Sequence, residues 1–314
     1  MNLKYWDVAE APRLTQTYND QIVGVPHCYS VSPEEFEEGF TYQKTSFRGY
    51  LEDIHYLEDI HSEKLIVCED NGVILGFSDV AIAETEYNGN KEQKKGFIRF
   101  LTYEIGQRHA GQVILKESEE YLLGLGIKQI KAFRLLCLND HCGYRFYHLG
   151  YASLSDKLGH IQGLFGMNGY QMSGGEISMD QPAYHVDEPI LSDKSLDITV
   201  EFQDSRAILP KLKVRAFRDG KEIGQCNSES AGECSCAKDA QDWLFITGLC
   251  IKESDQGKGL GRYLLQRNLW EMHKIGYKNT VISTDWNNFR ALLFYTNYGY
   301  KVADTAHEFI KNME

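Results

Sequence analysis

Hydrophobic and polar residues follow the same order in two distant segments of the chain, residues 96–130 and 242–282. Each segment opens with an apolar run that favours a buried strand, passes through a loop containing glycine, and continues with apolar residues at helical spacing. A late glycine, Gly126 or Gly276, follows each helical pattern and marks its end. A second run of β-forming residues comes next. The pattern therefore predicts strand, loop, helix and strand twice in one chain.

The two segments also share their spacing. Each leads to an aromatic pair followed by a Gly-Tyr dipeptide. Gly150 lies 39 residues after Gly111, and Gly299 lies 40 residues after Gly259. Similarity of this kind within one chain indicates an internal duplication.

The duplication predicts an α/β (α+β) fold of two tandem domains, residues 1–185 and 186–314, each with a mixed, mostly antiparallel sheet flanked by helices. Residues 179–197 hold two prolines and several acidic side chains, which is typical of a linker. Residues 11–25 and 32–40 have helical patterns, and the second opens with Ser-Pro-Glu-Glu, a helix-start signal.

Each copy also contains a predicted β-hairpin, turning at Asn71-Gly72 in the first and at Asp219-Gly220 in the second. The first copy has two predicted helices before its hairpin. The second copy has none, so we expect it to be the shorter of the two.

The chain has 314 residues and a net charge of −12, with 33 Lys and Arg against 45 Asp and Glu. This balance disfavours nucleic acid or an anionic membrane as a partner and mildly favours a cationic small molecule. The longest apolar run, residues 244–251, is too short to cross a bilayer. The first residues lack the pattern of a signal peptide, so we expect a cytoplasmic protein.

Eight cysteines in a chain of this length indicate free thiols of a cytosolic protein rather than a disulfide framework. Cys226, Cys234 and Cys236 form the one dense group. Their spacing lacks the CxxC rhythm and the fourth ligand of a zinc site. We therefore expect no metal, and an ordinary flexible loop at these residues.

Residues 255–265, DQGKGLGRYLL, place three glycines at the mouth of a predicted helix. Free backbone N–H groups and the positive end of the helix dipole favour an anion there, and glycine allows it to approach closely. The stretch is not a Walker loop, because no Gly-Lys-Ser/Thr follows. The dinucleotide fingerprint also fails, because Arg262 stands where its third glycine would be.

The stretch from Gln256 to Gly261 instead fits Q/R-x-x-G-x-G/A after a strand, and it resembles motif A of the GNAT acetyltransferase superfamily. Residues 287–300, NNFRALLFYTNYGY, are similar to the second signature of that family, Asn-x-x-Ala followed by an aromatic-Tyr pair and Gly-Tyr. Residues 195–314 resemble the family well, and residues 1–185 resemble it in degenerate form. A tandem arrangement of this kind is also found in mycothiol synthase.

The resemblance implies an acetyl-CoA site with no metal. The backbone N–H groups of the loop and one Arg side chain would bind the pyrophosphate. The end of the preceding strand would splay open and bind the pantetheine arm and the thioester carbonyl through its main chain. In chain order these roles fall on Leu249, Cys250 and Ile251, on Gln256, Gly257, Lys258, Gly259, Leu260, Gly261 and Arg262, and on Asn288 for pantetheine.

By the same resemblance, Tyr295 is the general acid that protonates the departing thiolate of CoA. A phenol titrates near the range of a thiol, so proton transfer between the two is roughly balanced. The alternative is a half-buried helix aromatic with no chemical role. The general base stays open: Thr247 and Gly248 stand where the family often has a carboxylate, and water relayed from Asp242, from Asp285 or from a group of the first copy is an alternative. Cys250 is expected to pack in the core, because transfer in this family is direct.

The first copy departs from the pattern at the positions that would carry the chemistry. Val113 stands in place of Gly261, and its branched side chain would crowd a pyrophosphate. Phe146 stands in place of Tyr295 and has no proton to give, while Tyr147 is one residue off and points about 100° away around a helix. We therefore expect a non-catalytic first domain and a catalytic second domain.

Together these observations favour an N-acetyltransferase that moves acetyl from acetyl-CoA to a small-molecule amine in a ternary complex. Two alternatives stay open: an acyltransferase with another donor, and a sensor or scaffold that keeps the fold without turnover. The sequence is compatible with a monomer containing an internal pseudo-dimer and with a homodimer.

Overall fold

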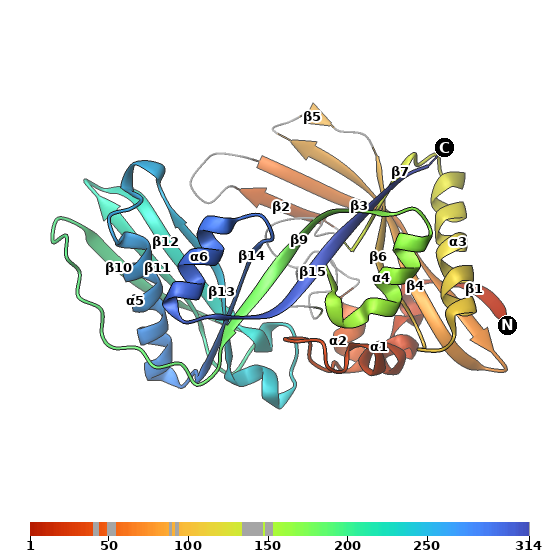
Figure 1. The fold of residues 1–314 in the computed structure, drawn as a ribbon, viewed down its shortest axis with the longest axis horizontal. Helices are drawn as coiled ribbons and strands as arrows, with labels where there is room; N and C mark the ends of the chain where they lie inside the picture. Colours follow the sequence, from red (N-terminus) through yellow and green to blue (C-terminus); the bar gives the residue numbers. More distant parts are fainter. Residues whose placement is uncertain are drawn as a thin grey trace. The chain divides into compact units, whose positions relative to one another are not determined.

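The computed structural model describes residues 1–39, 44–48, 55–87, 90–91, 94–133, 147 and 153–313. The chain forms two compact units (Figure 1). The first comprises the described residues of Met1–Gly49, Asp53–Glu176 and Asp304–Glu314, and the second comprises Ile177–Ala303. The C-terminal residues of the chain therefore belong to the first unit.

The strands of the first unit are β1 (Asn2–Trp6), β2 (Lys44–Arg48), β3 (His55–Asp70), β4 (Val73–Tyr87), β5 (Asn90–Lys91), β6 (Lys95–Tyr103), β7 (Gln129–Ala132) and β8 (Leu154–Ser155). Its sheet runs in the order β1-β3-β4-β6-β7, followed by the part of β15 (Lys301–Asn312) that lies in this unit. Pairing is antiparallel except between β6 and β7, which are parallel. The sheet is therefore mixed and mostly antiparallel, as the sequence predicts.

The helices of the first unit are the 3₁₀ helices Val8–Leu14 and Asp156–Leu158 and the helices α1 (Thr15–Ile22), α2 (Pro33–Glu38), α3 (Arg108–Gly124) and α4 (Gly159–Met167). The predicted helix pair is thus present, although α1 begins only after a 3₁₀ turn. Ser32 caps α2 by accepting a hydrogen bond from the N–H of Glu35, and Pro33 stands at the first helical position. This local chemistry explains why the start of α2 was predictable.

Aromatic side chains join this helix pair to the sheet. Tyr18 of α1 and Phe36 of α2 have ring centroids 5.2 Å apart. Phe100 of β6 lies 5.4 Å from Tyr18 and 5.7 Å from Phe77 of β4. All four side chains are fully buried. One face of the first unit's sheet is therefore closed by its own aromatic core.

The strands of the second unit are β10 (Asp197–Gln203), β11 (Lys211–Arg218), β12 (Lys221–Ser230), β13 (Trp243–Ile251) and β14 (Asn279–Asp285), in the order β14-β13-β12-β11-β10. The last residues of β9 (Gln171–Gln181) also belong to this unit. Strands β13 and β14 are parallel, whereas β10–β11, β11–β12 and β12–β13 pair antiparallel. Both predicted hairpin turns, Asn71-Gly72 between β3 and β4 and Asp219-Gly220 between β11 and β12, are confirmed.

The helices of the second unit are α5 (Leu260–Ile275) and α6 (Phe289–Tyr298), with 3₁₀ helices at Ala231–Glu233, Lys238–Asp242 and Glu253–Asp255. Helix α5 packs on β11, β12 and β13 (Figure 1). Both helices contribute to one apolar core, which includes Leu264, Leu269 and Tyr295. No α-helix lies between Ile177 and Ile251, a stretch that the structure describes throughout, so the second unit lacks a counterpart of α1 and α2.

Residues 182–196, inside the predicted linker, contain no helix or strand, but residues 179–181 belong to β9. The prediction of a flexible loop around the cysteine group is wrong for Cys226, which lies fully buried in β12. Because β12 pairs with a neighbour on both sides, backbone hydrogen bonding outweighs the polar composition of QCNSES.

Candidate functional site

Two strands of the second unit part beside the glycine-rich loop. Parallel pairing of β13 with β14 runs from Trp243 and Asn279 to Ile246 and Ile282 and then stops. Strand β13 continues to Ile251, paired only with β12. The edge of β13 that faces away from β12 therefore has no partner in β14 beyond Ile246, as the predicted splay requires.

A β-bulge coincides with the parting. Asn227 of β12 is opposite Gly248, and Ser228 is opposite Ile246, so Thr247 is an extra residue in β13. A bulge bends its strand and increases the local twist. Thr247 thus marks the point at which β13 turns away from β14.

The direction of the backbone groups after the bulge follows from one hydrogen bond. The N–H of Lys252 donates to the carbonyl of Ile223, which lies in β12. Backbone groups alternate along an antiparallel strand, so those of Ile251 and Leu249 point away from β12 and those of Cys250 point toward it. The carbonyl of Ile251 accepts a hydrogen bond from the side chain of Gln256 (2.8 Å). Of the three predicted strand residues, Leu249 and Ile251 present their main chain to the open side.

The loop after β13 reaches α5 through two glycines in left-handed conformation. Gly257 has φ 75°, and Gly259, the N-cap of α5, has φ 85°. Glycine adopts these angles without the steric penalty that a side chain brings. The cap has no side chain, so the first N–H groups of α5, from Leu260 onward, lack a side-chain acceptor. The helix begins with unsatisfied donors at the positive end of its dipole.

The space around these glycines is open. A Cβ atom built on Gly257 or Gly259 would meet no described atom within 4 Å. On Gly261, whose φ is ordinary, it would meet only Cγ1 of Ile251, at 3.6 Å. Packing therefore does not require glycine at residue 261. The bare backbone there is available to a bound group.

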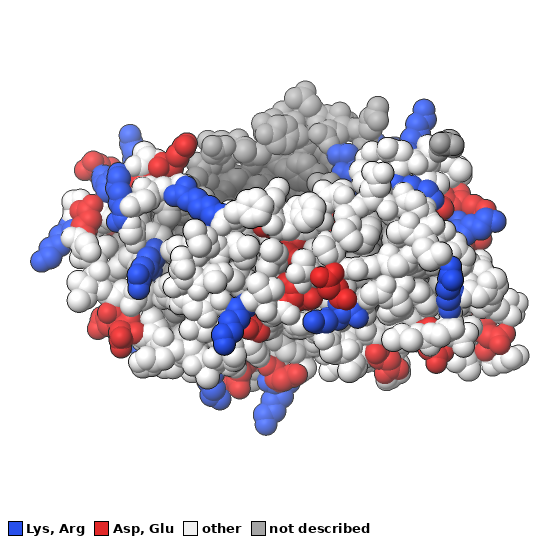
Figure 2. Space-filling model, in the orientation of Figure 1, with Lys and Arg blue, Asp and Glu red and all other residues white. Residues whose placement is uncertain are grey.

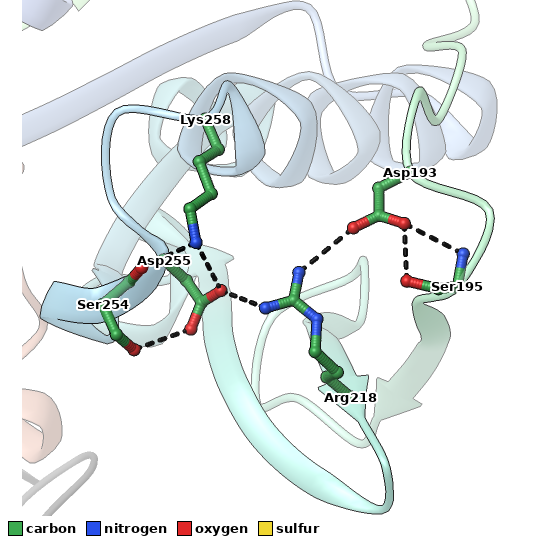
Figure 3. Close-up of polar contacts among 6 residues, drawn as sticks. All are labelled: Asp193, Ser195, Arg218, Ser254, Asp255 and Lys258. Atoms are coloured by element: carbon green, nitrogen blue, oxygen red, sulfur yellow. Dashed lines mark hydrogen bonds and ion pairs between the residues drawn. The ribbon is translucent and has the colours of Figure 1, made fainter.

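Charged side chains hold the loop in place (Figure 3). Asp255, which is buried, forms ion pairs with Arg218 and with Lys258 (3.3 Å). The hydroxyl of Ser254 and the guanidinium of Arg218 keep the pKa of Asp255 below its usual range. Arg218 also contacts Asp193 (3.1 Å). This network joins the loop to the hairpin and to the segment before β10, and it could not be read from the sequence because its members are far apart along the chain.

The cationic side chains next to the loop differ in how many hydrogen-bond and ion-pair partners they have. Lys258 donates to the carbonyl of Ser254 (2.7 Å) and to Asp255. Arg290 of α6 donates to the side-chain oxygen of Gln256. Arg262 is exposed, and within the described residues it has no ion pair. Arg262 is therefore the cation most available to an anion at the start of α5.

A pocket of about 400 Å³ lies between the start of α5 and the irregular segment before β10. Its wall includes Lys258, Gly259 and Arg262 on one side and Pro189 and Leu196 on the other. The start of α5, with its uncapped N–H groups, therefore borders a pocket that the segment before β10 completes.

Two predicted residues of α6 have structural partners. The side chain of Asn288 accepts a hydrogen bond from the N–H of Ala291 (3.2 Å) and so caps α6. Tyr295 is buried, 7 % exposed, and its ring packs against those of Phe294 and Tyr300. Burial raises the pKa of Tyr295, so the phenol keeps its proton at neutral pH. Tyr295 is therefore a neutral phenol within the apolar core of the second unit.

The other candidate nucleophile, bases and metal ligands of the second unit differ in their burial and their partners. Cys250, expected in the core, has intermediate burial, and this burial raises the pKa of its thiol. Asp242 lies 3.4 Å from Lys278, and Asp285 is exposed at the end of β14. In the part of the chain that the structure describes, no group of three or more His, Cys, Asp or Glu side chains is arranged to hold a metal ion.

The first unit fills the corresponding place with its own side chains. It has the same bulge, with Arg99 as the extra residue of β6 opposite Asp79 and Val80. Only four residues separate β6 from α3, against eight between β13 and α5. Gly111 lies against the ring of Tyr103, where an added Cβ would be 2.5 Å from Cδ1. Helix α4 completes the closure, because the hydroxyl of Tyr103 donates to the carbonyl of His160.

The predicted replacement Phe146, like Gly150, lies outside the described residues. Tyr147 is described and fully buried, and its hydroxyl accepts a hydrogen bond from the N–H of Ser155 (3.3 Å). Burial raises its pKa well above the usual value. Tyr147 is therefore part of the core of the first unit.

Residues 214–302 match the family model of the acetyltransferase (GNAT) domain. Among solved structures, a tandem GNAT protein from the clavulanic acid biosynthesis pathway is similar over 99 % of this chain and 98 % of its own, with 10 % identity and a TM-score of 0.67. A GCN5-related N-acetyltransferase from Sphaerobacter thermophilus is similar over 99 % and 95 %, with 12 % identity and a TM-score of 0.58. A glucosamine N-acetyltransferase region of a fungal multi-domain β-N-acetylglucosaminidase is similar over 99 % of this chain and 38 % of that one, with 13 % identity and a TM-score of 0.65. No curated protein matches this sequence.

The chain therefore has the tandem form of the GNAT acetyltransferase fold, as its sequence predicted. None of the helices in the described residues is long and apolar enough to span a membrane. On the face drawn in Figure 2, positive and negative side chains are interspersed and do not form one basic area.

Proposed function

We propose that the second unit transfers an acetyl group from acetyl-CoA to a primary amine of a small molecule, by direct attack in a ternary complex. One observation carries the proposal: β13 and β14 part after Ile246, directly before a glycine loop that opens α5. A thioester with a diphosphate at one end needs a slot for its arm and an anion site beside that slot. This unit supplies both from adjacent backbone.

The residues of the loop fit the diphosphate. N–H groups at the start of α5 point at the site without a capping side chain, and the positive φ of Gly257 and Gly259 exposes them. The open space at Gly261 lets oxygen atoms approach the backbone. Arg262 adds a positive charge that no other described residue neutralises. We assign these residues, with Gln256, Lys258 and Leu260, to coenzyme binding.

The open edge of β13 supports a role in the acyl-transfer step. Leu249 and Ile251 direct N–H groups to the side that β14 has left. Bound acetyl-CoA supplies an activated acyl carbonyl, whose oxygen gains negative charge when an amine attacks. Fixed N–H donors that face such an oxygen stabilise the transition state, typically by about 2.7–4 kcal/mol for each donor.

Tyr295 supplies the proton that the departing thiolate needs. Its raised pKa keeps the phenol protonated across the neutral range. The same burial makes the phenolate costly, so Tyr295 is a weaker acid than a phenol in water, and the proposal requires the departing thiolate to lie within hydrogen-bond reach of its hydroxyl. The attacking amine must be neutral, and water that leads to Asp285, at the end of β14, is our assignment for removing its proton. Asp242 precedes β13, at the end of the strand away from the slot, and pairs with Lys278. The side-chain amide of Asn288 keeps its N–H groups for pantetheine while its oxygen caps α6.

The acceptor is a cationic small molecule in this proposal, consistent with a net charge of −12 and with the absence of one basic area on the face in Figure 2. The test is release of CoA from acetyl-CoA with propylamine, spermidine, kanamycin and a lysine-rich peptide. We expect release with at least one amine and none with propanol. Binding of CoA without release for any amine would favour a sensor, and absence of CoA binding would overturn the proposal altogether.

A further inference from the structure

The face of the second unit's sheet that lies opposite α5 contains an unsatisfied polar group. Cys226 and Ser228 face α5, because the carbonyl of Cys226 and the hydroxyl of Ser228 both bind the side chain of Asn268 (3.1 and 2.7 Å). Side chains alternate along a strand, so Asn227 points to the opposite face. Asn227 is only 9 % exposed. Its Oδ1 atom is buried and has no hydrogen-bond partner among the described residues.

A buried acceptor without a donor is costly, by roughly 1–3 kcal/mol. Such groups are rare in folded proteins and call for an explanation. Asn227 lies opposite Gly248, at the bulge where β13 and β14 part. The unsatisfied oxygen therefore belongs to the residue opposite Gly248, directly before Leu249, whose N–H is proposed to face the acyl carbonyl.

The first unit shows what fits this position. Its sheet has the same bulge and the same end of parallel pairing, with Asp79 where the second unit has Asn227 and Arg99 where it has Thr247. Asp79 is fully buried, and the guanidinium of Arg99 lies 3.3 Å from its carboxylate. The acceptor oxygen of the first unit is thus paired with a nitrogen cation from its own chain.

The residues around Asn227 are also smaller or more polar than those around Asp79. Phe77 and Phe100, which close this face of the first unit against α1 and α2, correspond to Gln225 and Gly248 of the second unit. Asn227 is the neutral counterpart of Asp79, and Thr247 is too short to take the place of Arg99. The second unit therefore keeps the hydrogen-bond acceptor, removes the side chain that paired with it and removes the aromatic packing around it.

We propose that Asn227 binds the amino group of the acceptor, whose N–H donates to Oδ1 where the guanidinium of Arg99 pairs with Asp79 in the first unit. The inference rests on the proposed acetyl transfer and names the residue that positions the amine for it. Asn227 accepts a hydrogen bond from an amine without a buried negative charge. A carboxylate here would hold the amine as a cation, and a cation cannot attack. An amide therefore suits a nucleophile that must be neutral.

The first test replaces Asn227 by leucine, which has a similar volume and no acceptor. With propylamine as the acceptor, we expect KM for the amine to rise about 10- to 100-fold, with kcat and CoA affinity changed less than about 3-fold. The melting temperature should stay the same or rise, because the variant no longer buries an unsatisfied oxygen. A lower melting temperature with an unchanged KM would show a structural role and overturn the inference.

The second test rebuilds the first unit's pair in the second unit with the double variant Asn227→Asp and Thr247→Arg. The new guanidinium should occupy the amine position, so CoA release with propylamine should fall at least about 100-fold. Calorimetric binding of CoA should persist, which shows that the variant is folded. Amine turnover at the wild-type rate would contradict the inference.

A third measurement uses the wild-type protein and so does not depend on how a variant folds. The side-chain amide signal of Asn227 in a ¹⁵N NMR spectrum, assigned by its loss in Asn227→Leu, should shift when propylamine is added and not when propanol is added. An unchanged signal would mean that the amine does not bind Oδ1 of Asn227, and it would overturn the inference. If CoA binds and Asn227 fails these tests, only this inference falls, whereas a protein that does not bind CoA loses the proposed function as well.

Discussion

The two units share the same strand pairing and differ in the side chains that surround it. Both have a bulge one residue after the last parallel pair, with Arg99 or Thr247 as the extra residue. In the first unit Tyr103 packs against Gly111, and Arg99 pairs with Asp79. In the second unit the space at Gly259 is open, and the side-chain oxygen of Asn227 is buried without a hydrogen-bond partner among the described residues. The comparison teaches that two units of one fold can keep the same strand register while side chains occupy in one unit the places that lie around the glycine loop and the bulge of the other.

The loop length adds a second difference. Helix α3 begins at Arg108, the counterpart of Gln256 by spacing from the preceding strand, so residues that form a loop in the second unit are helical in the first. A shorter loop brings the helix closer to its strand. The N–H groups that could bind an anion in the second unit are replaced by a helical turn beside α4.

The largest expected effect comes from Tyr295→Phe, which gives the second unit the side chain that Phe146 has in the first. Loss of a general acid slows acyl transfer by about 10²- to 10⁴-fold, and we expect kcat to fall within this range while CoA affinity is unchanged. Steady-state kinetics of CoA release give the value.

Tyr298→Phe is the matched control for that variant. Burial raises the pKa of Tyr298 to about 12, with Arg262 opposing the rise, and its ring also packs against Tyr300. Its replacement should change kcat less than about 3-fold. Equal losses for the two variants would remove the assignment of Tyr295 as the acid.

Whether a feature of the two units could be predicted from the sequence depends on how far apart its interacting residues lie along the chain. The duplication, both hairpin turns and the cap at Ser32 were predictable, because each is set by residues close together in the chain. The open space at Gly261 was implied by the motif and agrees with the structure.

Other features were not predictable, because they join distant segments. Tyr103 reaches Gly111 and His160 only after α4 has packed, and Arg218 reaches Asp255 only when the hairpin meets the loop. The return of residues 304–312 to the first unit depends on pairing of β15 with β7, which lies more than 170 residues earlier. Hydrophobic pattern alone does not specify such partners.

The next largest effect is expected on stability, from loss of the buried ion pair between Arg99 and Asp79 in the first unit. Arg99→Leu would leave Asp79 and Glu63 buried without their shared cation, which is expected to destabilise the protein by about 3–5 kcal/mol. Thr247→Val, the matched change at the equivalent bulge, should cost under about 1 kcal/mol. Urea denaturation of the two variants measures the difference. Equal stabilities would mean that Arg99 does not hold the first unit closed.

Gly261→Val copies Val113 of the first unit into the open loop. The backbone of Gly261 is ordinary and its Cβ position is free of clashes, so the variant should fold normally. Affinity for CoA should fall about 10- to 100-fold, because the branched side chain takes the place of the diphosphate. Gly166→Val in α4, where a Cβ meets no described atom within 4 Å, should leave CoA binding unchanged.

The smallest expected effect is pH-dependent and concerns the ion network of the loop. The pKa of Asp255 is lowered in the folded protein, so its stabilisation is present above the usual value near 3.8 and is lost as pH falls through the lowered value. The melting temperature of Asp255→Asn should be below that of the wild type at pH 7, and the two should converge below about pH 4. A constant difference at all pH values would exclude the ionised carboxylate as the cause.

The most direct test of the account is the number of CoA molecules bound by the full-length chain in isothermal titration calorimetry. An open second unit and a filled first unit predict one molecule of CoA per chain, lost in Gly261→Val and kept in Gly166→Val. Two molecules per chain would show that the side chains of the first unit do not block its site. No binding, or one molecule that survives Gly261→Val, would contradict the assignment of the site to the second unit.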